Sequence, residues 1–362
     1  VIEAGASVSS LHTSYAAQRE ALTALTPPAA SSALVPLLTD EASARILTAF
    51  AQGVWRPFGT LVITPGARMV HDDLAQASWL DPRVSAAYGV GRYTTFKGAW
   101  NIDHQAVNRL TQEDRQYGDT TFWALSDGTA ILVPRVQQVS GGATIAGLGA
   151  VFDGRIFYRR LDSLTMFAPR LLPGTAPASN GAGLQTGSGT ARGMELAVQD
   201  RMRGNSLAAA YTLGRARDTF PGLEANAFPA DGDRLHQFTA ADVFRIRGGW
   251  SANAALVAAS GQPVTPATGV QQVWFPTGLF EIQPLYGPRN SSRLPAYHRL
   301  DVGGQYAHRF GGVASTLGVT VFNVYNRPNV ALYDYDPVGS TVNTTAVPLT
   351  SRAVDAFFRI EF

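Results

Sequence analysis

The sequence of 362 residues contains no cysteine. Disulfide bonds within the chain and thiolate metal sites are therefore excluded. Charge is also scarce, because Asp, Glu, Lys and Arg make up 15% of the residues, against roughly 25% in soluble domains. The formal net charge is only +2, which argues against a nucleic-acid partner.

Long hydrophobic runs are missing as well. No stretch reaches the roughly 18 apolar residues of a transmembrane helix. The opening VIEAGASVSS has no initiator Met, basic segment or cleavage motif, so we expect no signal peptide there and interpret Val1 as a processed or truncated beginning. Hydrophobic residues nevertheless make up 45% of the chain. A β-barrel is then the remaining way in which such a chain can cross a membrane.

What the sequence does contain is alternation with a period of two. In the final RAVDAFFRIEF (352–362), one parity is apolar and the other mostly charged. The apolar parity is Val354, Ala356, Phe358, Ile360 and Phe362, and the charged residues of the other are Asp355, Arg359 and Glu361. Such a strand fits between an apolar solvent and water. A register slip of one residue would move Arg359 into lipid, at a cost of about 2–4 kcal/mol near the midplane.

The same alternation predicts about fourteen strands. They are expected at residues 2–15, 44–56, 60–71, 82–90, 93–102, 136–148, 151–164, 190–200, 205–216, 235–246, 250–262, 298–310, 314–326 and 352–362.

Short and long connections alternate between these strands. Links such as GVGRY (89–93) and FGGVA (310–314) are short. Long loops are expected at 16–43, 72–81, 103–135, 165–189, 217–234, 263–297 and 327–351. Tight periplasmic turns alternating with large extracellular loops are typical of outer-membrane barrels, whereas a soluble sandwich or propeller predicts no such alternation. We therefore predict an all-β fold, a transmembrane antiparallel up-and-down β-barrel.

Several motifs carry a more specific signal. They are YTLGRARDTFPG (211–222), NAFPADGDRLHQFTAADVFRI (226–246), WSANAALVAASGQPVTP (250–266), RLPAYHRLDVGGQY (293–306) and VTVFNVYNRPNV (319–330). Together they resemble the C-terminal strands of TonB-dependent outer-membrane receptors. The matching positions include Asp233, His236, Gly261, Asp301 and Asn323. The resemblance also implies that Phe358, Ile360 and Phe362 form the signal read by the barrel-assembly machinery.

The resemblance implies a 22-stranded barrel around an N-terminal plug domain. This chain has neither plug nor TonB-contacting box, so residues 1–362 are expected to form the C-terminal portion of the barrel. The plug and the first strands would lie in the same precursor or in another chain, unless this is a reduced relative that closes at fourteen strands. The implied partners are outer-membrane lipid and lipopolysaccharide, the TonB complex acting through the plug, and a surface lipoprotein. The implied location is the Gram-negative outer membrane.

The implied function is uptake of a large scarce solute, such as a siderophore, cofactor or oligosaccharide. The barrel would perform no chemistry, so we predict no enzyme activity and no cofactor. Two alternatives remain open. A barrel that closes at fourteen strands would be a passive channel, and a receptor relative without a plug would be a structural scaffold for partner proteins.

Candidate site residues are confined to the loops. The six histidines form no spaced ligand set, so no metal site and no catalytic residue is predicted. His71-Asp72-Asp73 reads as a solvated loop tip, and Asp103-His104 and Asp233 with His236 as strand–loop junctions. Loop aromatics and arginines could clasp a bulky ligand, or equally well belong to the interfacial girdle. These candidates are Trp123, Arg135, Trp274, Tyr286, Arg289, Tyr333 and Tyr335.

Overall fold

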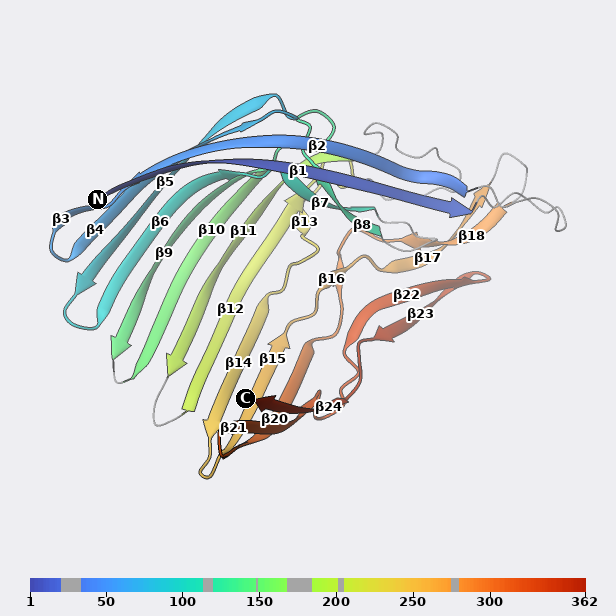
Figure 1. Ribbon diagram of the computed structural model, residues 1–362. Coiled ribbons are helices and arrows are strands. Elements are labelled where there is room, and N and C mark those ends of the chain that lie inside the picture. Colours follow the sequence, from blue (N-terminus) through green and yellow to red (C-terminus); the bar gives the residue numbers. More distant parts are fainter. Residues whose placement is uncertain (21–33, 113–119, 148, 168–183, 201–204, 275–279) are drawn as a thin grey trace.

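The computed structural model describes residues 1–20, 34–112, 120–147, 149–167, 184–200, 205–274 and 280–362. One large curved sheet dominates it (Figure 1). Fourteen strands form the main path of this sheet, each antiparallel to the next. In order they are β1 (Ile2–Glu20), β2 (Leu34–Gly53), β4 (Leu61–Asp72), β5 (Ala77–Val90), β6 (Thr94–His104), β9 (Arg135–Gly147), β10 (Ala150–Phe167), β11 (Leu184–Asp200), β12 (Asn205–Thr219), β14 (His236–Arg245), β15 (Trp250–Ala259), β20 (Tyr297–Phe310), β21 (Val313–Phe322) and β24 (Ala353–Glu361).

Shorter strands lie in the connections. They are β3 (Trp55–Phe58), β7 (Val107–Gln112), β8 (Thr120–Leu125), β13 (Phe228–Pro229), β16 (Pro263–Val264), β17 (Ala267–Trp274), β18 (Phe280–Tyr286), β19 (Ser292–Arg293), β22 (Val330–Val338) and β23 (Thr341–Pro348). Among the described residues, no helix is long and apolar enough to cross a membrane. The predicted all-β fold with about fourteen main strands is confirmed.

Tight turns gather at one end of the sheet. Gly91, Gly149, Gly249 and Gly311 lie in these turns with φ between 60° and 86°, a left-handed conformation that glycine adopts without steric cost. Both chain ends lie at this turn end, because Ile2 pairs with Gly53 and Glu361 pairs with Ala314. The other end carries the long connections, and we call it the loop end.

One of the predicted loops is a tight turn in the structure, and others lie partly outside the described residues. The long loop predicted at 72–81 is wrong, because β4 reaches Asp72, β5 begins at Ala77, and only residues 73–76 form the turn. Asp72 is fully buried there, and its Oδ1 accepts the backbone N–H groups of Leu74 and Ala75. Of the loops predicted at 16–43 and 165–189, residues 21–33 and 168–183 lie outside the described part.

The register divides the side chains of the sheet into two faces. One row of directly paired residues runs from Val354 through Val321 and Val302 to Ala254. The adjacent row of opposite parity runs from Asp355 through Thr320 and Gly303 to Asn253. Each row keeps its face from strand to strand, because opposite partners lie on the same side of a sheet. We call the two sides the apolar face and the polar face.

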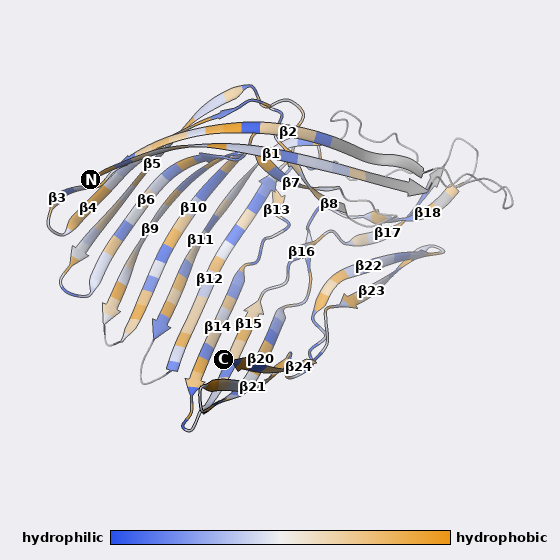
Figure 2. Ribbon diagram, viewed as in Figure 1, coloured by the Kyte–Doolittle hydropathy of each residue, from blue (hydrophilic) through white to orange (hydrophobic). Residues whose placement is uncertain are grey.

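The apolar face continues across all fourteen strands. It exposes large side chains on β2, β4, β6, β10, β11, β21 and β24. Hydrophobic and hydrophilic residues alternate along many of the strands in Figure 2. These are Leu47, Met69, Phe96, Phe152, Ile156, Leu196, Leu317, Val354 and Phe358. A water-soluble monomer rarely exposes a contiguous apolar surface of this extent. The face therefore needs an apolar medium or partner.

The sheet is an open arc. β1 and β24 form its two edges, and among the described residues nothing pairs with the free edge of either strand (Figure 1). Long open edges present unpaired backbone N–H and C=O groups, which no lipid-exposed sheet can leave unsatisfied. The alternative in which fourteen strands close on themselves is not realised in this structure.

One small hydrophobic core lies at the loop end. Leu110, Phe122, Ala124 and Phe167 are buried together, and the ring of Tyr15 stacks on Phe122 at 4.5 Å between centroids. The cluster fastens the β7–β8 hairpin to the ends of β1 and β10. The described part of the connection predicted at 103–135 therefore contains a pair of strands, β7 and β8, that packs against the main sheet.

Candidate functional site on the polar face and at the loop end

The polar face carries side chains that bond to one another from strand to strand. Gln52 Nε2 donates to Glu3 Oε2 at 2.6 Å, and Arg83 Nη2 donates to Gln52 Oε1 at 2.8 Å. Arg155 forms an ion pair with Glu195 on the neighbouring strand. These groups remain partly exposed, so each pair stabilises the fold only modestly. Their exposed polar atoms can bond to polar groups of a molecule that lies against the polar face.

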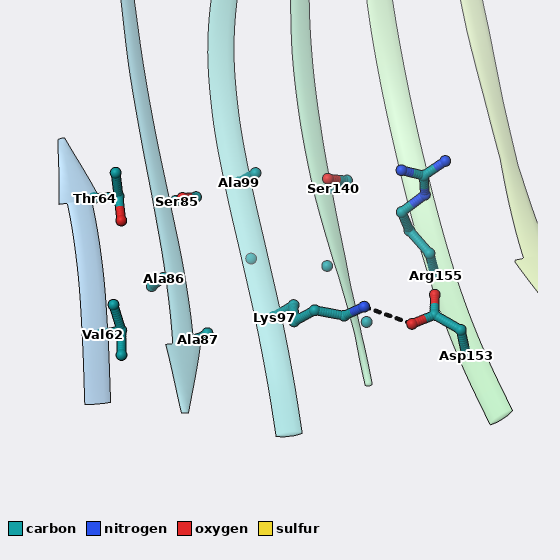
Figure 3. Close-up of a pocket in the computed structure, with 13 residues that line it drawn as sticks. Val62, Thr64, Ser85, Ala86, Ala87, Lys97, Ala99, Ser140, Asp153 and Arg155 are labelled. Atoms are coloured by element: carbon teal, nitrogen blue, oxygen red, sulfur yellow. Dashed lines mark hydrogen bonds and ion pairs between the residues drawn. The ribbon is translucent and has the colours of Figure 1, made fainter. Parts of the chain in front are cut away.

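A hollow of about 310 Å³ lies on this face between β4 and β10. Figure 3 shows small side chains along its floor, with the long side chains of Lys97 and Arg155 beside them. Lys97 Nζ lies 2.5 Å from Asp153 Oδ2, and the Lys97 side chain is 47% exposed. The small lining residues are Thr64, Ser85, Ala87, Ala99, Ser140 and Gly142.

Gly142, which lines the hollow, allows β9 and β10 to lie close together. A Cβ at this position would lie 2.1 Å from the carbonyl oxygen of Gly154 on β10, so any side chain would force β9 and β10 apart. The hollow is a shallow polar recess beside the partly exposed ammonium group of Lys97. An acidic or hydrogen-bonding side chain of another domain could fit there.

A buried carboxylate lies nearer the loop end. Asp81 is 2% exposed and receives Arg68 Nη2 at 2.7 Å on one oxygen and His104 Nδ1 at 2.6 Å on the other. Trp79 stacks on the His104 ring with 5.5 Å between centroids. A buried charge held by two partners locks β4, β5 and β6 together. His104 is thus engaged in a structural cluster.

The long connections at the loop end are tied by two arginines. Arg289 is 7% exposed and its Nη2 contacts Asp231 at 3.2 Å, while its backbone N–H donates to Glu224 at 2.9 Å. Arg293 binds the carboxylate of Asp233, whose other oxygen accepts the Ala216 N–H at 2.7 Å. The connections 217–234 and 263–297 therefore form one assembly.

Asp218 is the perturbed carboxyl group of this assembly. Asp218 lies near the loop end of β12. The pairing of β12 with β14 ends five residues earlier, at Leu213. Burial raises the pKa of Asp218 to about 6, repulsion from Asp231 adds to this, and Arg289 opposes it. Asp218 can therefore change its charge at mildly acidic pH.

The structure brings together some of the candidate ligand residues. Tyr286 of β18 meets Tyr335 of β22 edge to face with centroids 5.9 Å apart, and Tyr333 lies 6.3 Å from Tyr335. Arg289 follows Tyr286 by three residues and reaches into the Asp231 assembly. Aromatic rings and charged groups from three connections therefore share one region at the loop end.

The other candidates lie apart. Trp123 is 58% exposed on β8, in the hairpin near β1. Arg135 begins β9 and lies 3.4 Å from Asp162. Trp274 pairs with Phe280 through the β17–β18 ladder, and its side chain lies outside the described part. Phe358, Ile360 and Phe362 are exposed on the apolar face of the last strand.

Two asparagines of the motif at 319–330 hold the turn after β21 in place through hydrogen bonds. Asn323 is 1% exposed with φ of 51°; its N–H donates to Asp301 Oδ1 at 2.9 Å, and its side chain bonds the backbone of Arg327 in both directions. Asn329 bonds both backbone groups of His298. These residues close the turn after β21 onto β20.

Sequence reasoning missed the Asp81 cluster and the arginine–aspartate pairs between connections. For the Asp81 cluster the sequence offers one signal, because Arg68 and Asp81 both have the parity of the polar face. For the arginine–aspartate pairs between connections the sequence offers no signal, because Asp231 and Arg289 lie 58 positions apart. In the described residues no group of three or more His, Asp or Glu side chains is arranged to hold a metal ion.

The fold matches solved outer-membrane receptors. It superposes on the unliganded ferric citrate transporter FecA with a TM-score of 0.59 at 12% identity, over 99% of this chain and 51% of FecA. It superposes on the pyoverdine receptor FpvA of Pseudomonas aeruginosa, bound to pyoverdine, with a TM-score of 0.57 at 13% identity, over 91% of this chain and 44% of FpvA.

The chain has the fold of an outer-membrane receptor barrel. The FrpB iron transporter of Neisseria meningitidis matches as well, with a TM-score of 0.56 at 11% identity, over 89% of this chain and 45% of FrpB. The proteins matched are receptors and transporters, not enzymes. No family model and no curated protein matches the sequence. The chain thus spans about half or less of each receptor, and the resemblance seen in the sequence motifs is confirmed for the fold.

Proposed function

We propose that this chain is the C-terminal part of the barrel of a TonB-dependent receptor, which takes up a large scarce solute across the outer membrane. The observation that carries the proposal is the continuous apolar face opposite a polar face across fourteen strands. Such a sheet fits lipid on one side and an aqueous or protein-filled lumen on the other.

The open edges support a larger barrel. In a closed barrel, the free edges of β1 and β24 would pair with further strands, which satisfies the backbone groups that an isolated arc leaves open. The structural matches, in which this chain covers about half or less of each receptor, are consistent with 22 strands in the whole protein. The additional strands would come from the same precursor or from another chain.

The polar face is proposed to hold a plug domain. Its paired but accessible groups, such as Lys97 with Asp153, can exchange internal partners for partners on the plug. TonB would then act on the plug. The strand-end residues Phe358, Ile360 and Phe362 are proposed to serve as the barrel-assembly signal, and a surface lipoprotein is a further proposed partner.

The loop end is proposed to bind the solute. The rings of Tyr286, Tyr333 and Tyr335 adjoin the buried Arg289 assembly, which offers stacking surfaces beside charge. Several of the matched structures are named for iron transport or a ferric siderophore. We therefore favour a ferric siderophore over an oligosaccharide.

Uptake in cells tests this function. Accumulation of labelled ferric siderophores, cobalamin and a maltodextrin is measured in cells with and without the gene, and with and without TonB. We expect uptake of one class that requires both. Uptake that persists without TonB would instead indicate the passive channel, and no uptake with retained partner proteins would indicate the scaffold.

A further inference from the structure

Two long connections meet at the loop end around a buried arginine. Arg289, in the connection 263–297, places its Nη2 at 3.2 and 3.3 Å from the two carboxylate oxygens of Asp231, in the connection 217–234. Asn290 Nδ2 donates to the same carboxylate at 2.7 Å. Bonds to one carboxylate, that of Asp231, therefore help to hold the two connections together.

A second carboxylate, that of Asp218, lies beside this contact. Asp218 pairs through its backbone with Gly189 of β11 and with Phe228 of β13. A Cβ on Gly189 would lie 2.7 Å from Asp218 Oδ1 and 3.2 Å from Leu164 Cδ1, so the carboxylate lies close to apolar side chains. In the part of the chain that the structure describes, no hydrogen bond or ion pair involves the Asp218 side chain.

Three charged groups decide the balance at this contact. The carboxylate of Asp231 and the guanidinium of Arg289 face Asp218, and the strand partners of Asp218 on β11 and β13 are uncharged. When Asp218 is neutral, Arg289 and Asp231 balance each other. When Asp218 is ionised, two carboxylates share one guanidinium, and the contact carries a net negative charge away from full hydration.

Asp231 is the group that can relieve this repulsion. Its side chain is 54% exposed, whereas that of Arg289 is 7% exposed. Asp231 can therefore turn into water while Arg289 remains beside Asp218. The bonds that Arg289 and the following residue make to Asp231 break in this step, and segment 289–290 loses its hold on the other connection.

We propose that the connections 217–234 and 263–297 form a proton-operated latch, which is closed while Asp218 is neutral and loosened when Asp218 is ionised. The latch closes at mildly acidic pH and loosens at neutral pH. Arg293 binds Asp233 independently of this group, so a loosened latch leaves the two connections joined at that second pair.

The latch acts on the site proposed for the solute. Tyr286 precedes Arg289 by three residues, and its ring meets that of Tyr335 with centroids 5.9 Å apart. A closed latch holds Tyr286 in place before the solute arrives, whereas a loosened latch leaves the cost of ordering this segment to the binding step. This consequence rests on the proposed function, whereas the latch itself does not.

Hydrogen exchange of the full-length protein in detergent tests the latch without any solute. Exchange of the peptide spanning 287–294 is followed by mass spectrometry at pH 5 and pH 7.5, and each rate is divided by the intrinsic rate at that pH. The amides of this peptide include Asn290 N–H, which donates to Thr265 Oγ1 at 3.1 Å. Because the pKa of Asp218 is about 6 in the closed latch and 3.8 for an ordinary aspartate, protection should be about tenfold lower at pH 7.5.

Three variants assign the effect to its residues. Asp218→Asn stays neutral at every pH and should show the protection of the acid form at both pH values. Asp231→Asn removes the carboxylate that holds Arg289 and should show low protection at both. The matched control, Asp336→Asn, removes an exposed carboxylate of β22 and should keep the difference seen in the parent.

Two results would overturn the latch. The first is equal protection of the parent at pH 5 and pH 7.5, which requires no variant and so does not depend on whether a variant folds. The second is an unchanged pH difference in Asp218→Asn, with its barrel folded on semi-native gels.

Solute binding separates the latch from the proposed function. Labelled ferric siderophores, cobalamin and a maltodextrin are titrated at both pH values on cells without TonB, so that binding is measured apart from import. Affinity should be lower at pH 7.5, by at most about tenfold, and Asp218→Asn should remove the difference. A pH-dependent exchange profile without TonB-dependent uptake would refute only the receptor function. TonB-dependent uptake with a flat exchange profile would refute only the latch.

Discussion

Gly261 shows how a single residue joins two connections. It lies two residues after the end of β15, and a Cβ there would come within 1.6 Å of the carbonyl oxygen of Leu294. The Leu294 N–H in turn donates to Gln262 O at 2.9 Å. Backbone meets backbone at this point, so only glycine fits.

Gly261→Ala is therefore expected to destabilise the folded protein by about 1–3 kcal/mol, the usual cost of overpacking. The temperature at which the folded form is lost on semi-native gels should fall. Gly232→Ala is the matched control, because nothing lies within 4 Å of a Cβ there. Equal effects of the two substitutions would contradict the close approach at Gly261.

Asp218 gives the loop assembly a pH dependence. Its folded-state pKa of about 6 exceeds the ordinary pKa of an aspartate, 3.8, so the folded state binds more protons than the unfolded state between these pH values. Stability should therefore fall as the pH rises from about 4 to 6, by on the order of 2–3 kcal/mol. Asp218→Asn should abolish this part of the dependence and stabilise the protein at pH 7. Urea unfolding of both proteins at pH 4 and pH 7 measures it, and parallel pH profiles would show that Asp218 titrates normally.

At the scale of the strand, the parity of the sequence decides which face meets which solvent. Val319 lies on the apolar face opposite Gly304 and Ala356, whereas its neighbour Thr320 lies on the polar face opposite Asp355. A charge at position 319 must enter the apolar medium. A charge at position 320 meets a carboxylate.

Val319→Arg should accordingly cost about 2–4 kcal/mol if the site lies near the membrane midplane. Thr320→Arg should cost much less. Folding yield into lipid vesicles and urea midpoints compare the two directly. A larger loss for Thr320→Arg would reverse the assignment of the two faces.

The same parity explains what the sequence could predict. Alternation in RAVDAFFRIEF predicts both faces of β24, because the period of a strand is strictly two. The placement of the hairpins within the long connections follows no such rule, because it depends on contacts between segments that are distant in the sequence. Tyr286 and Tyr335, which meet edge to face, belong to two different hairpins, β17–β18 and β22–β23. At 72–81 the sequence predicts a long loop, whereas the structure has a tight turn at 73–76 that the buried carboxylate of Asp72 caps.

At the scale of the whole molecule, the alternation of turns and loops sets an orientation. The turn at Gly311 and Gly312 lies at the same end as both chain ends, and the β22–β23 turn at Gly339 and Ser340 belongs to the loop connections. In the proposed membrane orientation these two turns face opposite aqueous compartments. The absence of cysteine from this sequence allows each to be labelled alone.

Ser340→Cys should react with a membrane-impermeant maleimide on intact cells, because its turn is expected to project from the cell surface. Gly312→Cys should react only after the outer membrane is opened, because its turn is expected to face the periplasm. The parent protein provides the background of any cysteine outside these 362 residues. The reverse pattern would place the loops inside. Labelling of both positions on intact cells would show that the sheet does not span the membrane, and the division of its faces between lipid and lumen would then have no basis.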